Sequence, residues 1–386
     1  MKEPEKIVRG SFGLKDRVRP QLDKSYHSPL IEKIRAEGFR LDQGRLEIRL
    51  AKEFGFCYGV ERAVEYAYET RARFPDHRIF LINEIIHNPR VNAELQQMGI
   101  KILTGDALQA EITRKDVVIM PAFGVPLEDL KRFQKIGCVI VDTTCGSVMS
   151  VWRRVESYGR DGFTAVIHGK YDHEETRATC SRTAKYLVVK DKKEAERVCG
   201  YIRGAVSRGS FLEVFKNACS PGFDPDKDLM KIGFANQTTM LSSESAEISD
   251  LLRVALRDRY GAPEAKECFR HFDTICSATQ DRQDAVRELG YMKMDLILVV
   301  GGYKSSNTGH LAEIASEFCP AYQVEDAACL ISAETICHKK AGSSEVLETR
   351  RWLPEGKIRV GITAGASTPN RVVGEVIERL IEIAAG

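Results

Sequence analysis

The chain has 386 residues, a formal net charge of +2, 43% hydrophobic residues and 29% charged residues. This length predicts two to three domains, and the composition is that of a globular protein. The near-neutral charge disfavours a general nucleic-acid binder, and no apolar run is long enough to form a bilayer-spanning helix. The opening sequence MKEPEKIVRG lacks the apolar stretch of a secretory signal, so we expect a reducing cytoplasm.

Short β-rich runs alternate with amphipathic helical stretches from about residue 45 onward. This alternation is typical of an α/β protein with mostly parallel sheets. In the helical stretch 60–73, for example, Val60, Ala63, Val64 and Ala67 fall on one face. The expected strands are 46–50, 79–82, 117–120, 139–141, 165–168, 186–189, 231–234, 296–300 and 358–362.

Two segments depart from this alternation. Residues 1–44 are polar and mixed in charge, and they indicate an N-terminal extension with one helix near 29–37. Residues 203–230 are rich in loop-forming residues, with a turn signal at 222–225, and predict an insertion that carries one short helix.

The chain has eleven cysteines and no C-x-x-C motif, which disfavours both a disulfide framework and a local zinc finger. Most of them are expected to be small buried residues. Three share a context, because a strand end runs into a helix through FGFC at 54–57, DTTC at 142–145 and DTIC at 273–276. This echo predicts three similar α/β units.

Cysteines in this position can bind a metal cluster. Ligands of α/β units bind at the carboxyl ends of the strands, where helix N-termini favour a thiolate. Three thiolates, one from each unit, would leave one iron of a four-iron cluster open to a substrate. The spacing alone fits three buried cysteines at strand ends equally well.

Polar segments follow several of the expected strands. His87 lies in EIIHN, and His173, Glu174 and Glu175 lie in HGKYDHEET. Alone, these residues also fit capping and first-turn positions of helices. The loops NQTT at 236–239, SSNT at 305–308 and AGASTP at 364–369 carry groups that bind phosphate or cap a helix. Neither a P-loop nor G-x-G-x-x-G occurs, so nucleotide binding has no support.

The motifs together match one family in order over about 45–386. The chain resembles 4-hydroxy-3-methylbut-2-enyl diphosphate reductase, the LytB/IspH family. The wording IHGKYDHEET and PAFG, with a long middle domain, is similar to the cyanobacterial and plant-type branch. The matching segments are FGFCYGVERAV, NEIIHNPRVN, VDTTCGSV, IHGKYDHEET, ANQTTM, DTICSATQDRQDAV, VVGGYKSSNT and GITAGASTPN.

The resemblance implies three similar α/β domains with mostly parallel sheets, arranged around a central iron–sulfur cluster. The expected boundaries are an extension at 1–44, a first strand at 45–57 that packs with the third domain, and domains at 58–145, 146–275 and 276–386. The implied activity is the last step of the non-mevalonate isoprenoid pathway, a two-electron reductive dehydroxylation that gives isopentenyl and dimethylallyl diphosphates.

Residue roles follow from the resemblance position by position. Cys57, Cys145 and Cys276 would bind one [4Fe-4S] cluster, which a purified sample can hold as a [3Fe-4S] remnant or lose. Glu175 would donate a proton, and Thr238 would orient the substrate hydroxyl and relay the proton. The substrate-binding residues would be His87, His173, Thr238, Thr279, Ser305, Ser306, Asn307 and Ser367.

The implied partners are a small allylic diphosphate and reduced ferredoxin or flavodoxin as electron donor, with no nucleic acid and no membrane. The implied compartment is the bacterial cytoplasm rather than the plastid stroma. Two residues depart from many bacterial members, which carry His at the position of Phe123 and Pro at that of Gly146. The first departure affects the number of histidine contacts, and the second affects the turn that carries Cys145.

Other functions fit parts of the same pattern. An iron–sulfur hydro-lyase also uses an open iron to remove a hydroxyl, but it needs no external electrons. A cluster-based redox sensor or a diphosphate-binding module would show no turnover with a reductant. A metal-free α/β protein with buried thiols would contain no iron.

Overall fold

The computed structural model describes residues 7–105 and 112–385, so residues 1–6 of the expected extension lie outside the described residues. The chain divides into two compact units. Unit 1 comprises residues 1–8 and 105–276, and unit 2 comprises residues 9–104 and 277–386. Each unit contains mostly parallel strands covered by helices, so the expected α/β class is confirmed.

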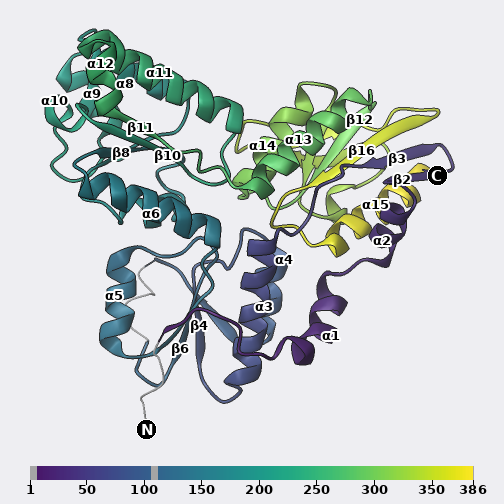
Figure 1. Ribbon diagram of the computed structural model, residues 1–386. Coiled ribbons are helices and arrows are strands. Elements are labelled where there is room, and N and C mark those ends of the chain that lie inside the picture. Colours follow the sequence, from purple (N-terminus) through teal and green to yellow (C-terminus); the bar gives the residue numbers. More distant parts are fainter. Residues whose placement is uncertain (1–6, 106–111, 386) are drawn as a thin grey trace. The chain divides into compact units, whose positions relative to one another are not determined.

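Unit 1 contains a four-stranded parallel sheet in the order β11-β10-β8-β9. Both central strands are buried along their whole length, as expected for a parallel sheet covered on two faces. Helix α6 covers one face, and α8 and α11 lie on the other (Figure 1). The strands are β8 (Thr164–His168), β9 (Tyr186–Val189), β10 (Ile232–Asn236) and β11 (Phe269–His271). The helices are α6 (Gly146–Arg160), α7 (Glu174–Cys180), α8 (Lys192–Ile202), α11 (Ser242–Tyr260) and α12 (Ala262–Cys268).

A second group of parallel strands in unit 1 precedes this sheet along the chain. Strand β1 pairs with β7, and β7 pairs with β6. The bounds of this group are β1 (Ile7–Val8), β6 (Val117–Met120), α5 (Leu127–Ile136) and β7 (Val139–Asp142).

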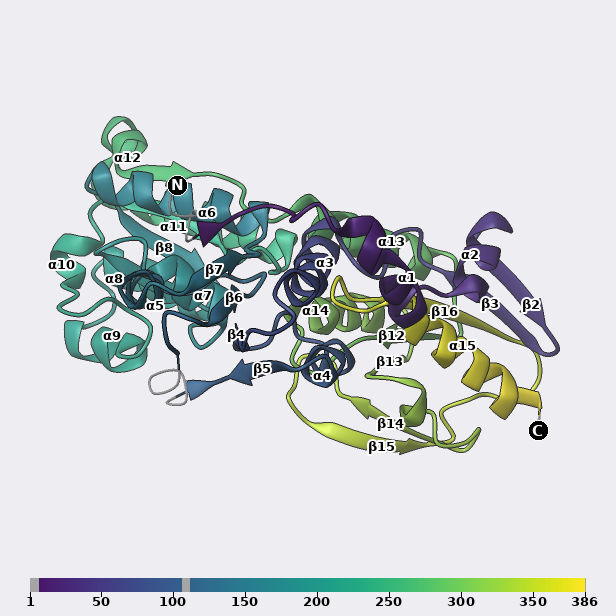
Figure 2. The same ribbon diagram turned by 90° about the horizontal axis from the view of Figure 1, so that it is seen from below.

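Unit 2 contains a seven-stranded sheet in the order β15-β14-β13-β12-β16-β3-β2. The parallel centre is extended by antiparallel strands at both edges, and β14 and β15 form a long hairpin (Figure 2). Helices α13 and α14 pack together on one face, and α15 packs with α2 on the other. The strands are β2 (Arg40–Gln43), β3 (Leu46–Leu50), β12 (Leu296–Val300), β13 (Ala321–Val324), β14 (Thr335–Lys339), β15 (Val346–Arg350) and β16 (Ile358–Ala364). The helices are α2 (Pro29–Ala36), α13 (Ser277–Tyr291), α14 (Ser306–Ser316), η2 (Ala327–Cys329) and α15 (Asn370–Ala385).

Unit 2 also holds a parallel pair of strands, β4 with β5, and the helices next to them. Helix α4 begins with a strong N-terminal signal, because the Asn88 side chain accepts a hydrogen bond from the Val91 amide and Pro89 follows directly. The bounds are α3 (Tyr58–Arg73), β4 (Ile79–Ile82), α4 (Pro89–Gln97) and β5 (Ile100–Leu103).

The N-terminal extension contains two helices where the sequence predicts one. The expected helix is present as α2, whereas α1 (Lys15–Tyr26) was missed because it buries only Val18 and Tyr26 and contains Pro20. The segment 9–26 binds to α3 of its own unit. The Tyr26 and Tyr68 hydroxyls lie 3.0 Å apart, and the Phe12 amide donates to the buried Glu69 carboxylate at 2.6 Å.

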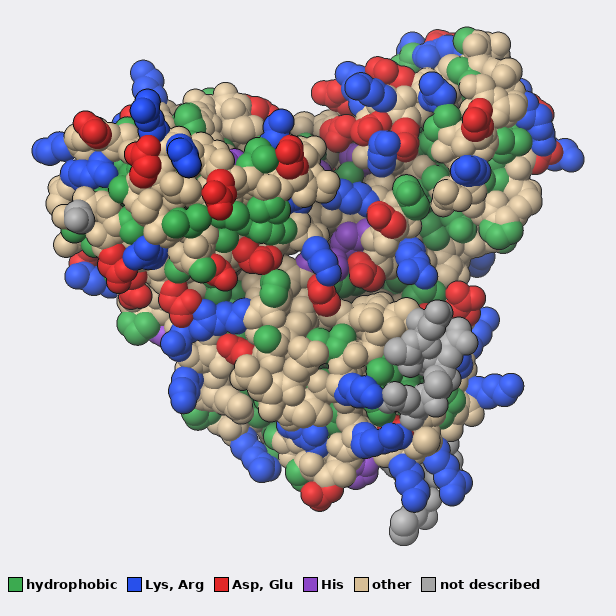
Figure 3. Space-filling model, turned by 180° about the vertical axis from the view of Figure 1, so that it is seen from behind, with side chains coloured by type: hydrophobic (Ala, Val, Ile, Leu, Met, Phe, Trp, Pro, Cys, Tyr) green, Lys and Arg blue, Asp and Glu red, His purple; other side chains and the backbone are tan. Residues whose placement is uncertain are grey.

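The loop-rich segment 203–230 carries two short helices, α9 (Arg208–Phe215) and α10 (Pro225–Asp228), rather than the one expected. Within the described ranges, no helix is both long and apolar enough to cross a bilayer. On the face drawn in Figure 3, basic and acidic side chains are interspersed, in line with the small net charge.

Candidate functional site

The three cysteines singled out by the sequence occupy the same place in their local folds. Each cysteine follows a strand and directly precedes a helix. Its backbone amide donates to a carbonyl in the loop that follows the neighbouring parallel strand. The accepting residue lies two positions beyond the end of that strand, at residue 366 after β16, 122 after β6 and 238 after β10. The pairs are Cys57 N with Ala366 O at 3.2 Å, Cys145 N with Ala122 O at 2.9 Å and Cys276 N with Thr238 O at 3.3 Å.

The two D-T-x-C loops of unit 1 are built by the same side-chain hydrogen bonds. Asp142 and Asp273 each accept from the amide two residues ahead, which forms the turn. The following threonine hydroxyl donates to the last carbonyl of the neighbouring strand. These bonds join Thr143 to Met120 at 2.5 Å and Thr274 to Asn236 at 3.3 Å. The two loops that share the D-T-x-C sequence therefore also share these hydrogen bonds.

The loop that leads to Cys57 in unit 2 reaches the same placement without those side chains. Phe54 and Gly55 stand where the other loops have Asp and Thr. Gly55 has φ +80°, a conformation that favours glycine, and a Cβ there would lie 2.6 Å from Asn370 Oδ1. Glycine is therefore required at this turn.

The other cysteines mostly behave as buried thiols. Burial raises the pKa of Cys138, Cys199 and Cys319 to about 11 and that of Cys180 to about 12. A thiol with such a pKa supplies few thiolates at neutral pH. Cys57, Cys145 and Cys276 are each partly exposed, at the start of helices of 15 or 16 residues. This donor set fits a cluster that needs thiolate ligands.

Glu175 and Thr238 form a buried carboxylate–hydroxyl pair in unit 1. Glu175 lies in the first turn of α7 and is 1% exposed. Its Oε1 accepts from the Thr238 amide at 2.6 Å, and its Oε2 accepts from the Thr238 hydroxyl at 3.0 Å. Because Thr238 also accepts from the Cys276 amide, the carboxylate, the hydroxyl and one cysteine loop are linked through a single residue.

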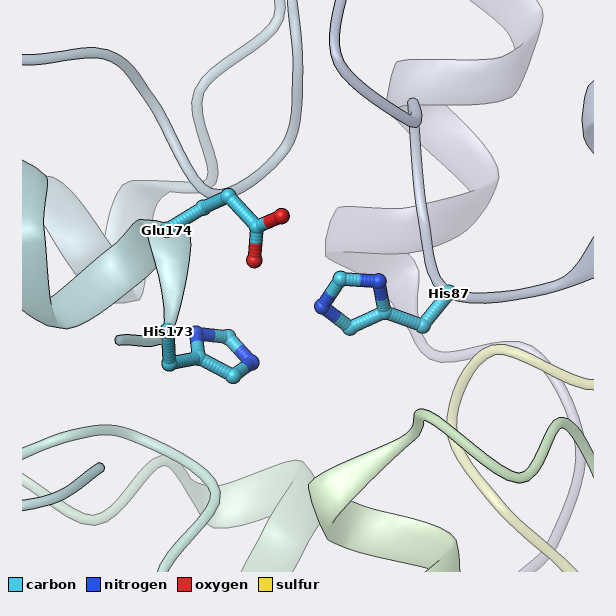
Figure 4. Close-up of side chains that lie close together, drawn as sticks. All are labelled: His87, His173 and Glu174. Atoms are coloured by element: carbon cyan, nitrogen blue, oxygen red, sulfur yellow. The ribbon is translucent and has the colours of Figure 1, made fainter. Parts of the chain in front are cut away.

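His173 caps α7 and is fixed as a neutral ring. The Glu175 amide donates to His173 Nδ1 at 3.1 Å, so the ring proton resides on Nε2. Figure 4 shows His173 and its neighbour Glu174 at the start of this helix. Phe123 packs edge-on against the His173 ring, with centroids 5.4 Å apart. Phe123 thus supports the histidine ring that caps α7.

Gly146, the second departure, is the first residue of α6 and sits in open space, since a Cβ there would meet nothing within 4 Å among the described residues. The Cys145 loop keeps its hydrogen bonds without a proline. Nothing in the structure explains the replacement further.

His87 of unit 2 lies in the loop between β4 and α4, where the Glu84 carboxylate holds its ring. Its Nδ1 donates to Glu84 Oε2 at 2.9 Å, and this bond holds the pKa of Glu84 below its usual range. A second proton on Nε2 would make the ring a cation that the carboxylate stabilises. The two histidines therefore differ, because His173 accepts at Nδ1 and His87 donates there.

Hydroxyls and amides from three loops of unit 2 meet beside His87. The Ser367 hydroxyl lies 3.4 Å from both the His87 carbonyl and the Ser305 hydroxyl. Ser305 caps α14 by accepting from the Thr308 amide. The Asn307 side chain accepts from the Ala366 amide at 2.8 Å. The structure thus brings together His87, Ser305, Asn307 and Ser367, with Ser306 next in the chain.

Two of these side chains keep unused hydrogen-bonding atoms. Ser306 Oγ and Asn307 Nδ2 are buried and have no hydrogen-bond partner among the described residues. Unsatisfied buried polar atoms are costly, so they indicate a ligand or water at this position. Thr279 lies on α13 and is 1% exposed.

Two residues without an assigned role from the sequence also shape the site. Glu84 orients His87, as described above. Gln237 is buried in the loop after β10, where its Oε1 accepts from the Lys170 amide and the Thr176 hydroxyl and thereby fixes the loop before α7. Both lie inside segments that the sequence singled out, but their roles depend on side-chain contacts that the sequence does not show.

The family model and the relatives described next match this chain over nearly its whole length. The family model described as LytB protein matches residues 48–381. A 4-hydroxy-3-methylbut-2-enyl diphosphate reductase of Gloeobacter violaceus is 48% identical, with 99% of this chain and 93% of that protein covered. The protein of the same name from Thermosynechococcus vestitus is 46% identical, with 98% and 95% covered.

Two solved structures are similar. One is an (E)-4-hydroxy-3-methyl-but-2-enyl diphosphate reductase, described as the terminal enzyme of the non-mevalonate pathway, with a TM-score of 0.53, 25% identity, and 87% of this chain and 99% of that chain covered. The other is the E-1-hydroxy-2-methyl-but-2-enyl-4-diphosphate reductase from Plasmodium falciparum, with a TM-score of 0.63, 19% identity and 86% of each chain covered. The latter shows a shared fold.

Proposed function

Because this chain belongs to the LytB protein family, we propose that it is a 4-hydroxy-3-methylbut-2-enyl diphosphate reductase. The reaction is a two-electron reductive dehydroxylation of the allylic diphosphate to isopentenyl and dimethylallyl diphosphates, with loss of water. The observation that carries this proposal is the similarity over nearly the whole chain to reductases of that name. An oxidoreductase with these products completes the non-mevalonate pathway.

Cys57, Cys145 and Cys276 are proposed to bind one [4Fe-4S] cluster. Their common backbone position, their partial exposure and their helix N-termini fit thiolate ligation. When bound, the cluster would supply the electrons and one iron with Lewis-acid character. The same three loops support the proposal of three α/β domains at 58–145, 146–275 and 276–386.

Glu175 is the proposed proton donor, with Thr238 as its relay. A proton on Glu175 Oε2 would reverse the hydrogen bond to the Thr238 hydroxyl, so that the carboxyl group donates and the hydroxyl donates onward. The Thr238 amide keeps Oε1 in place during this exchange. The leaving substrate oxygen would receive that proton, a step that positioned general acids accelerate.

The diphosphate is proposed to bind to hydroxyl, amide and imidazole groups. Ser306 Oγ and Asn307 Nδ2 would gain the partners that they lack. The remaining proposed contacts are His87, His173, Ser305, Ser367 and Thr238, with Thr279 on the wall of the site. The N-terminus of α14, directly after Ser305, favours a negative charge.

The electron donor is proposed to be reduced ferredoxin or flavodoxin, and the compartment the bacterial cytoplasm. The first-named relatives are cyanobacterial, which supports this assignment.

The deciding experiment is turnover under anaerobic conditions. The purified protein is incubated with 4-hydroxy-3-methylbut-2-enyl diphosphate, with and without a chemically reduced flavodoxin, and the products are identified by mass spectrometry. We expect isopentenyl and dimethylallyl diphosphates only when the reductant is present. Conversion without electrons would indicate a hydro-lyase, and binding without conversion in a protein with full iron content would contradict the reductase assignment.

A further inference from the structure

Cys329 and Cys337 of unit 2 form a pair that the proposed reaction does not use. Cys329 ends η2, and Cys337 lies in β14. Leu330 and Ile336 pair across an isolated antiparallel bridge, and Cys329 and Cys337 are the residues that flank this pair on its outer side. Helix η2 and strand β14 also contact each other, which brings the two cysteines into the same small region.

Both sulfur atoms lie at one phenol group. The Tyr303 hydroxyl is 3.4 Å from Cys329 Sγ, and the Cys337 side chain lies near the same phenol group. The pKa of the Cys337 thiol is raised first by burial and next by Cys329, so the two sulfurs are within electrostatic range. Both cysteines are partly exposed and unbonded, which leaves them accessible to a small oxidant.

A second cysteine pair in unit 1 provides a contrast. Cys180 and Cys219 both influence Tyr186, yet neither affects the pKa of the other, and Cys180 is almost completely buried. Sharing an aromatic neighbour is therefore not enough to make a thiol pair. Cys329 and Cys337 differ because they flank a bridged residue pair and because Cys329 contributes to the raised pKa of Cys337.

We propose that Cys329 and Cys337 are the site of a reversible intramolecular disulfide, and that Tyr303 transmits its state to the adjacent loop. A low-molecular-weight disulfide is the oxidant. One thiolate attacks it and releases a thiolate, and the second cysteine then attacks the mixed disulfide and releases the other. The two cysteines lose two electrons and two protons, and the oxidant becomes two thiols.

Tyr303 connects this pair to the loop that caps α14. Its amide donates to Glu325 at 3.2 Å, and its carbonyl accepts from Lys339 Nζ at 2.5 Å. Ser305, which caps α14, is two residues further along, and a Cβ on the preceding Gly302 would lie 2.7 Å from the His87 carbonyl. Forming the disulfide would remove the thiol partner of the Tyr303 hydroxyl and so loosen one of the contacts that hold this loop.

The effect on catalysis rests on the proposed diphosphate role of this loop, whereas the disulfide itself does not. We expect KM for the diphosphate to rise about three- to tenfold on oxidation, the size expected from one lost hydrogen bond, with little change in kcat.

The test uses the full chain with its cluster, under anaerobic conditions, and oxidised glutathione as the probe. Free thiols are blocked with N-ethylmaleimide, and the protein is cleaved after glutamate, which separates the two cysteines at Glu334 and removes Cys319 at Glu325. We expect peptides 326–334 and 335–345 to be linked, and the link to disappear on reduction. Cluster absorbance is followed in parallel so that oxidation of ligands of the cluster is recognised.

Four variants make the result decisive. Cys329→Ser and Cys337→Ser should each abolish the link, and the double variant should keep a constant KM in the oxidant. Cys319→Ser, which removes another partly exposed cysteine of unit 2, should leave the link intact. Full alkylation of both cysteines after incubation with excess oxidised glutathione would overturn the proposed site. A linked pair with unchanged KM would overturn the role of Tyr303.

Discussion

The two units fix equivalent functional residues by opposite means. In unit 1, the cysteine loops are shaped by Asp and Thr side chains, whereas His173 is fixed by a backbone amide. In unit 2, the Cys57 loop is shaped by the backbone of Gly55, whereas His87 is fixed by the Glu84 carboxylate. The comparison teaches that the placement of a functional group is preserved while the interactions that produce it differ.

The largest expected effect concerns the buried acid of unit 1. Glu175→Gln removes the group proposed to donate the proton, but its amide keeps a similar shape. We expect kcat to fall by about 10²- to 10⁴-fold, the usual contribution of general acid catalysis, with unchanged cluster absorbance. The measurement is anaerobic steady-state turnover. Glu174→Gln, one residue away, should lower kcat far less, and an active Glu175→Gln variant would exclude the acid role.

Gly55 and Gly146 provide the next test. Gly55 lies two residues before Cys57, and Gly146 directly follows Cys145. Gly55→Ala forces a side chain into a left-handed conformation and toward Asn370, which should cost about 1 to 3 kcal/mol. Gly146→Ala lies in open space at the start of α6 and should be neutral or slightly stabilising. Midpoints of urea unfolding measure both. Equal effects would mean that the Cys57 loop does not depend on glycine.

The threonines of the D-T-x-C loops test whether side chains shape unit 1. Thr143→Val removes a hydrogen bond to the Met120 carbonyl at a fully buried position, which should destabilise the protein by about 1 kcal/mol. Thr274→Val removes both the bond to the Asn236 carbonyl and the bond that the Thr274 hydroxyl accepts from the Asn236 amide at 2.7 Å, so it should cost at least as much. Urea unfolding of the two variants measures the loss of unfolding free energy in each. The reverse ranking of the two losses would contradict this prediction.

Glu84 gives the smallest expected effect and a pH signature. Its pKa is lowered in the folded state by the bond from His87, so the stabilisation is present above its usual pKa of 4.5 and is lost as pH falls through the lowered value. Glu84→Gln should therefore cost up to about 1 kcal/mol at neutral pH and nothing in acid below that value. Unfolding midpoints between neutral and acidic pH would show this, and a pH-independent difference would contradict it.

Much of this arrangement could be predicted from the sequence. The expected strands occur with small shifts at their ends, because their apolar runs are buried in parallel sheets. The D-T-x-C echo located two equivalent loops, since Asp and Thr form the same hydrogen bonds in both. Gly55 could not be found in this way, because its role appears only in its φ angle and in the position of Asn370.

Other features were missed for related reasons. Helix α1 buries too few residues to give a periodic signal. The pairing of Glu84 with His87 was visible as two nearby residues, but the sequence does not say which way their side chains point. The contact between Tyr303 and Cys329 joins residues that are far apart in the chain, so no local sequence pattern reveals it.

The central claim is that three cysteines in equivalent loops bind one cluster, and iron analysis tests it most directly. Iron and sulfide are counted in anaerobically purified wild-type protein and in Cys57→Ser, Cys145→Ser, Cys276→Ser and the control Cys268→Ser, alongside their absorbance spectra. The account predicts about four iron atoms per chain in the wild type and the control, and a deficient or unstable cluster in each of the other three. A full, stable cluster in any one of those three would contradict it.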